Sequence, residues 1–126
     1  MSEVEPPDDR ERRRRLLGVK LRALVSEHLG GPDGLAGVEA ADLPRGAALA
    51  VDDAAWVLVE GPAARSLGPA LAWAVRHGAA SLNVIADSDT GLLARRAAQL
   101  AFPTSIWFAH DRTLIPAVVE PLDAPP

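Results

Sequence analysis

The stretch that decides the fold is AALAVDDAAWVLVEGP, residues 47–62. It holds two apolar arms, 47–51 and 54–60, on either side of the polar pair Asp52 and Asp53. Two apolar arms separated by two turn-forming residues predict a β-hairpin. A Gly-Pro pair follows the second arm, which indicates that the strand ends there and the chain changes direction.

Beyond this hairpin, helical and strand patterns alternate along the chain. Helices are expected over about 66–78 and 90–101, and 82–86 is a short apolar strand between them. The segments 105–109 and 113–119 predict a second hairpin at the end of the pattern. Strands that alternate with helices of this length favour βαβ crossovers and therefore a parallel core.

The predicted fold class is α/β: a small mixed sheet of about five strands with a parallel βαβαβ core, antiparallel hairpin edges and an additional N-terminal helix. Right-handed crossovers place both middle helices on one face of the sheet if the strand order is sequential. The N-terminal helix, or a partner chain, then has to cover the other face. Pro116 places the last strand at a sheet edge or a bulge, because proline has no N–H for the ladder.

A chain of 126 residues is long enough for one hydrophobic core. We expect a disordered N-terminus over 1–8, one α/β domain over 9–120 and a Pro-rich tail over 121–126. The domain is expected to contain an N-terminal helix over 9–29, a connector over 30–46 and the sheet core over 47–120. Because the Pro-rich end resembles a linker, the N-terminal domain of a longer protein is one option.

Composition narrows the class of protein. The chain has no cysteine, which fits a reducing compartment. The Arg-rich start lacks the apolar segment of a secretory signal, and no apolar run has the roughly 18–20 residues of a membrane span. A bacterial cytoplasmic protein without membrane contact is therefore expected. Residues 46–126 carry five arginines against eight Asp and Glu, which disfavours nucleic-acid binding without a metal ion or a further domain.

Acidic residues follow the predicted parallel strands. Glu60 ends the first central strand, and Asp87 and Asp89 follow the second. The carboxyl ends of neighbouring parallel strands lie at one sheet edge about 4.8 Å apart, close enough for carboxylates to share a cation such as Mg²⁺. The sequence thus offers Glu60, Asp87 and Asp89 as metal ligands and as candidate catalytic residues.

A strand that ends in Glu-Gly, followed by a strand that ends in Asp-x-Asp, by Gly91 and by a helix, resembles the acidic signature of the Toprim domains of primases and topoisomerases. The resemblance covers about residues 56–100, with one helix between the acidic motifs where Toprim domains have a further strand and helix. It implies a Mg²⁺-dependent enzyme of phosphate-ester chemistry, with Glu60 as general acid or base and Asp87 and Asp89 as metal ligands.

Each acidic residue also has a structural role open to it. Asp89 directly precedes a predicted helix, where Asp is a favoured N-cap. Asp87 can accept hydrogen bonds from backbone amides of its turn, and Glu60 can face solvent. The three histidines lie on different elements without metal-ligand spacing, and no glycine-rich segment matches a nucleotide-binding fingerprint.

The leading hypothesis is a non-enzymatic module that binds a protein partner, another copy of itself or a small ligand. No complete catalytic constellation can be assembled from the sequence, so enzymatic activity stays open and the Mg²⁺-dependent enzyme is the alternative. Leu17, Leu21 and Leu24 form one stripe on the first helix, and we expect self-association or partner binding through them. Asn83 lies inside an apolar strand and needs a buried partner.

Overall fold

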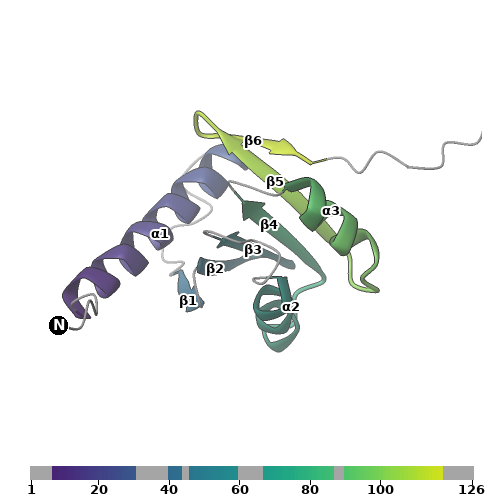
Figure 1. The fold of residues 1–126 in the computed structure, drawn as a ribbon, viewed down its shortest axis with the longest axis horizontal. Helices are drawn as coiled ribbons and strands as arrows, with labels where there is room; N and C mark the ends of the chain where they lie inside the picture. The colour runs from purple at the N-terminus through teal and green to yellow at the C-terminus, as the bar shows by residue number, and fades with distance from the viewer. Residues whose placement is uncertain (1–6, 31–39, 44–45, 60–66, 87–89, 118–126) are drawn as a thin grey trace, which may run out of the picture.

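The computed structural model describes residues 7–30, 40–43, 46–59, 67–86 and 90–117. In chain order the elements are α1 (Pro7–His28), β1 (Ala41–Leu43), β2 (Gly46–Val51), β3 (Ala54–Val59), α2 (Leu67–Arg76), β4 (Ser81–Ala86), α3 (Thr90–Ala98), β5 (Thr104–His110) and β6 (Thr113–Pro116) (Figure 1). None of these described helices combines the length and the apolar character that crossing a bilayer requires.

The strands form one sheet in the order β1-β2-β3-β4-β5-β6. β3, β4 and β5 are parallel neighbours, whereas β1, β2 and β6 are paired antiparallel. The predicted α/β class, with its parallel core, hairpin edges and N-terminal helix, is therefore confirmed. The additional strand is β1, which lies within the predicted connector and pairs with β2. Three residues are too few to show the alternation that identifies a strand in a sequence.

The β2–β3 hairpin forms around the predicted turn. Asp52 has a φ of 53°, a left-handed conformation that Asp tolerates better than most side chains. The carbonyl oxygen of Asp53 accepts a hydrogen bond from the backbone N–H of Ala80 at 2.7 Å. Because Ala80 directly precedes β4, the turn fixes the start of β4 beside the start of β3.

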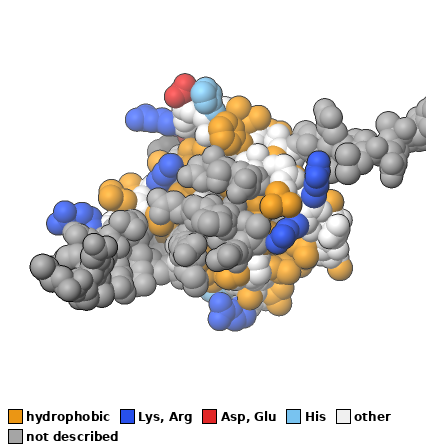
Figure 2. Space-filling model, viewed as in Figure 1, with side chains coloured by type: hydrophobic (Ala, Val, Ile, Leu, Met, Phe, Trp, Pro, Cys, Tyr) orange, Lys and Arg blue, Asp and Glu red, His pale blue; other side chains and the backbone are white. Residues whose placement is uncertain are grey.

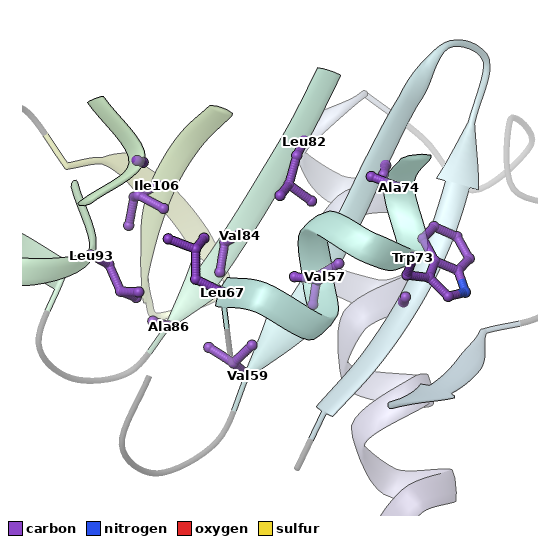
Figure 3. Packing of buried hydrophobic residues seen from close by; sticks show 14 of the residues in the cluster. Val57, Val59, Leu67, Trp73, Ala74, Leu82, Val84, Ala86, Leu93 and Ile106 are labelled. Atoms are coloured by element: carbon purple, nitrogen blue, oxygen red, sulfur yellow. The ribbon is translucent and has the colours of Figure 1, made fainter. Parts of the chain in front are cut away.

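α2 and α3 cover one face of the sheet. Figure 3 shows Leu67 and Trp73 of α2, and Leu93 of α3, among the apolar side chains of β3, β4 and β5. The sheet residues buried on this face are Ala48, Ala55, Val57, Val59, Leu82, Val84, Ala86 and Ile106. Both middle helices thus lie on the same side, as the right-handed crossovers of a sequential sheet require.

The end of α2 is capped as its sequence predicts. Gly78 has a φ of 69°, and its N–H bonds to the carbonyl of Val75 at 3.1 Å, while Ala79 N–H bonds to the carbonyl of Ala74 at 3.0 Å. This pair of bonds is the Schellman motif that a C-terminal glycine allows. His77 Nδ1 lies 2.9 Å from the carbonyl oxygen of Trp73, so this histidine also has a structural explanation at the helix end.

α1 covers the opposite face. Leu17, Leu21 and Leu24 are 8%, 0% and 5% exposed and pack with sheet residues such as Leu49 and Ile85. The stripe that we expected to meet a partner therefore meets the sheet of its own chain, because that face had no other helix to cover it. While α1 stays packed, most of the surface of these three leucines is therefore covered by the sheet. Self-association itself remains a prediction, and residues beside this stripe would have to supply most of its contacts.

α1 begins at Pro7, two residues before the predicted start, and its first turns extend beyond the sheet near β1 (Figure 1). Proline suits the first turn of a helix, where an N–H would have no partner within the helix. The predicted tail at 121–126 and residues 1–6 of the predicted N-terminal tail lie outside the described residues. The proposed domain limits stay predictions.

β6 is an edge strand, as Pro116 predicted. Pro116 lies opposite Trp107 in the pairing with β5, and the next residue, Ala117, donates its N–H to the carbonyl of Ile106 at 2.8 Å. Successive N–H positions of a strand point to opposite sides, so position 116 faces the free edge. Proline has no N–H to present there, which makes this edge a poor template for another strand.

A two-residue turn joins β5 to β6. Asp111 and Arg112 have φ angles of 46° and 67°, the signs of a type I′ turn, in which both central residues take positive φ. Asn-Gly and Asp-Gly are the usual pairs in this turn, because glycine has no Cβ to crowd the backbone. Arg112 therefore occupies a position that favours glycine.

We expect Arg112→Gly to raise the free energy of unfolding by about 0.5–1 kcal/mol, because relief of the left-handed strain exceeds the added flexibility of the unfolded chain. Urea denaturation followed by circular dichroism measures the change. Arg95→Gly is the control, since Arg95 is exposed within α3, where glycine costs about 1 kcal/mol. A loss of stability in both variants would show that the turn gains nothing from glycine.

Candidate functional site

The predicted acidic site rests on the order and direction of the central strands. Val59, the last residue of β3, pairs with Ala86, the last residue of β4, and Ala86 pairs with Phe108 of β5. The parallel arrangement that the prediction requires is therefore present. Glu60, Asp87 and Asp89 themselves lie outside the described residues, so their proposed roles stay predictions. Among the residues that are described, no group of three or more His, Asp or Glu side chains could hold a metal ion.

A groove of about 540 Å³ lies between α1 and the β5–β6 turn. One wall is formed by α1 and the other by the turn and the end of β5. Among the described residues, the groove is lined by Lys20, Ala23, Leu24 and Glu27 from α1, and by Ala109, Asp111 and Arg112 from the hairpin. Each wall of the groove thus carries both apolar side chains and charged groups.

The α1 wall follows from helical spacing. Lys20, Ala23 and Glu27 lie three and four residues apart, so they share one side of the helix. Leu16 and Val19 are 62% and 64% exposed and extend this side toward the N-terminus. α1 therefore carries a second stripe beside the buried leucine stripe. We call Leu16, Val19, Lys20, Ala23 and Glu27 the outer stripe.

The groove carries both signs of charge. Lys20 and Glu27 come from α1, and Asp111 and Arg112 come from the hairpin. Neither Lys20 nor Glu27 forms a salt bridge with another residue in the described part of the chain. Two basic and two acidic groups suit a partner that also carries mixed charges, and they favour neither a phosphate group nor a metal cation.

A polar and aromatic cluster fixes the end of α1 on the sheet. The His28 ring lies 5.4 Å from that of Trp56 and 4.8 Å from that of Trp107, both edge-on. Trp107 Nε1 donates a hydrogen bond to Asn83 Oδ1 at 3.0 Å, and Asn83 Nδ2 donates to the carbonyl of Ala55 at 3.4 Å. Asn83 thus has the partner that its apolar strand requires. Trp56 is only 5% exposed, whereas Trp107 is half-buried and His28 is exposed, so the cluster links α1 to the sheet and Trp56 offers no open face to a ligand.

We expect Asn83→Leu to lower the free energy of unfolding by about 1–3 kcal/mol, because the Trp107 indole N–H loses its acceptor in a partly buried site. Thermal and urea denaturation measure the loss. In a Trp107→Phe background the same substitution should cost clearly less, since no donor is then left unpaired. Equal costs in the two backgrounds would mean that this hydrogen bond contributes nothing to stability.

A second, smaller recess of about 340 Å³ lies between α3 and the strands β5 and β6. Its walls include Ala94, Ala97, Ile106 and Pro116. Thr104 also lines the recess, and its hydroxyl donates to the carbonyl of Phe102 at 2.9 Å. None of the described residues that line the recess is charged, so these residues offer little to orient a polar ligand.

The groove was not predicted from the sequence. The outer stripe of α1 is visible as helical spacing, but it is weaker than the leucine stripe beside it. The opposite wall comes from a turn more than eighty residues later in the chain. Only the packing of α1 against β6 brings the two walls together.

Comparisons of the chain with protein-family models, with curated proteins and with solved structures gave no match.

Proposed function

We propose that this chain is a non-enzymatic protein-interaction module of the cytoplasm, and that its binding surface is the groove between α1 and the β5–β6 turn. The observation that supports the proposal is the outer stripe, which pairs exposed Leu16 and Val19 with the charged groove residues. Leu16 and Val19 lie next to each other on the helix and form a small apolar patch, which a protein partner that also meets the adjacent charges can cover.

Nucleic acid is a poor occupant of this surface. Affinity for a phosphate backbone depends on several Lys and Arg side chains that act together, and the groove contributes Lys20 and Arg112 alongside two acids. Figure 2 shows basic side chains scattered over one face of the described surface rather than gathered into one patch. A segment of protein that carries both charges meets these groups better.

The first turns of α1 give further support. The described residues of α1 before Leu17 are exposed where their side chains are described, and these turns extend past the sheet (Figure 1). Short helices without tertiary contacts are only marginally stable in water. A partner that lies along the outer stripe would therefore also stabilise this part of α1.

The test is the variant Ala23→Arg, which places a large charged side chain in the groove. The wild-type protein should self-associate in sedimentation experiments or retain a specific protein from a lysate, and Ala23→Arg should lose this binding. Val75→Arg is the control, because Val75 is 59% exposed on α2. The proposal fails if the wild type neither self-associates nor retains a protein, or if both variants bind as well as the wild type does.

A second candidate function rests on a different observation, the in-register ends of β3 and β4. Val59 and Ala86 are paired neighbours, and Glu60 and Asp87 follow them directly in the sequence. We infer that, if their carboxylates meet, they would hold Mg²⁺ with Asp89 for phosphate-ester chemistry. The ion would neutralise charge that develops on the phosphate, and Glu60 would act as general acid or base.

Mg²⁺ binding should appear as thermal stabilisation. At a free concentration 100 times Kd, a single site adds about 2.7 kcal/mol, which corresponds to a rise in Tm of about 5 °C or more. Glu60→Gln and Asp87→Asn should abolish the rise, and Asp52→Asn in the exposed β2–β3 turn should keep it. The absence of any rise at millimolar Mg²⁺ or Ca²⁺ would leave the three acids with structural roles only.

A further inference from the structure

We infer that the occupant of the groove is a second copy of this chain, bound so that the two α1 helices run antiparallel about a two-fold axis beside Ala23. The inference rests on the proposed function, because it names the partner for the same surface. Its basis is the placement of the two charges on the outer stripe.

Lys20 and Glu27 are seven residues apart, which is two helical turns or about 10.5 Å along the axis. They therefore lie on the same side of α1, and the point midway between them falls beside Ala23. In an antiparallel pair with its two-fold axis at that point, Lys20 of each copy faces Glu27 of the partner subunit. The symmetry makes this contact twice, so the surface is complementary to itself.

Ala23 allows the close approach that such a pair needs. Packed helices lie 8–10 Å apart, with the closest approach where the contact side chains are small. Ala23 is exposed, lies between the two charges and lines the groove. The small side chain is therefore located where the helices would cross.

The charges also select this register over another antiparallel one. An axis beside Val19 would bring more of the exposed surface of Leu16 and Val19 into contact. It would also set the Lys20 side chains of the two copies against each other, and like charges across an interface are unfavourable. The register about Ala23 replaces this repulsion with two ion pairs.

The hairpin wall fits the same occupant. Asp111 and Arg112 supply one group of each sign at the groove, as Lys20 and Glu27 do on α1. A surface that carries both signs can meet a copy of itself without net repulsion. A ligand of one sign would always meet two like charges.

Charge reversal gives a test that depends on this arrangement. Sedimentation equilibrium should show a wild-type dimer, and Lys20→Glu or Glu27→Lys should each raise the dimer Kd by about tenfold or more, because each variant sets like charges against each other twice. An equimolar mixture of the two variants should associate with nearly wild-type affinity. The Lys20→Glu variant has acidic side chains at both positions and the Glu27→Lys variant has basic ones, so opposite charges face each other at both contacts. The double variant carrying both substitutions should also dimerise.

Controls separate folding from association. Circular dichroism should be unchanged in both reversal variants, because Lys20 and Glu27 are exposed, and Val75→Arg should leave the dimer intact. A wild type that stays monomeric up to millimolar concentration overturns the inference. If the monomeric wild type still retains another protein and Ala23→Arg does not, the proposed function stands. If neither retains a protein, both the inference and the proposed function fail. A dimer that ignores charge reversal, or variants that do not associate when mixed, overturns the antiparallel arrangement alone.

Discussion

Gly46→Ala is expected to lower the free energy of unfolding by about 1–3 kcal/mol or more, as overpacking of a tight site does. A Cβ at position 46 would collide with the carbonyl oxygen of Leu58 in the adjacent strand. Gly46 pairs with Val59 on one side and with Leu43 on the other, so neither neighbour can move without disturbing its own ladder. Since domains of this size are stable by only 5–15 kcal/mol, urea denaturation should show the loss clearly.

The matched control is Gly91→Ala. A Cβ at position 91 meets nothing within 4 Å, and the residue is in α3, where alanine is favoured over glycine by up to about 1 kcal/mol. This variant should be as stable as the wild type or more so. Equal stability of Gly46→Ala and the wild type would mean that β2 and β3 separate more easily than their pairing indicates.

Leu21→Ala is the second large effect, with an expected loss of about 2–5 kcal/mol. The Leu21 side chain is 0% exposed between α1 and the sheet, so its removal leaves a cavity under the helix. Relative to the wild type, hydrogen exchange should accelerate more for the α1 amides than for the amides in β3 and β4. The same variant should weaken any binding at the groove, because α1 forms one of its walls.

Leu16→Ala in the same helix is the control for burial. Leu16 is 62% exposed, so this variant should change the free energy of unfolding by less than about 0.5 kcal/mol. If Leu16→Ala and Leu21→Ala lower the free energy of unfolding by the same amount, α1 is not packed on the sheet as described. The leucine stripe would then again be open to a partner.

The sheet core was predictable because its strands carry strong local patterns. The two apolar arms around Asp52 and the short apolar run before Asp87 each point to one interpretation, and sequential right-handed crossovers determine which face the helices cover. Pro116 placed the last strand at the edge for an equally local reason. β1 was missed because three residues show no period.

The role of α1 was not predictable from its own sequence. A leucine stripe looks the same whether it meets the chain's own sheet or a partner, and only the uncovered face of the sheet decides between the two. The cluster of His28, Trp56 and Trp107 joins α1, β3 and β5, which are far apart in the chain. Asn83 was different, since a polar residue in an apolar strand must have a partner whose identity alone was unknown.

The proline at the outer edge of β6 limits how copies of this chain can accumulate. Ribbon-like polymers grow when one sheet continues into the next through backbone hydrogen bonds. Pro116 has no N–H to donate at the free edge of β6, where such growth would start. Contacts between helices about a two-fold axis, in contrast, are saturated after one partner. If copies pair through α1 as proposed, the chain is therefore expected to stop at closed pairs at high concentration instead of extending into fibres from this edge.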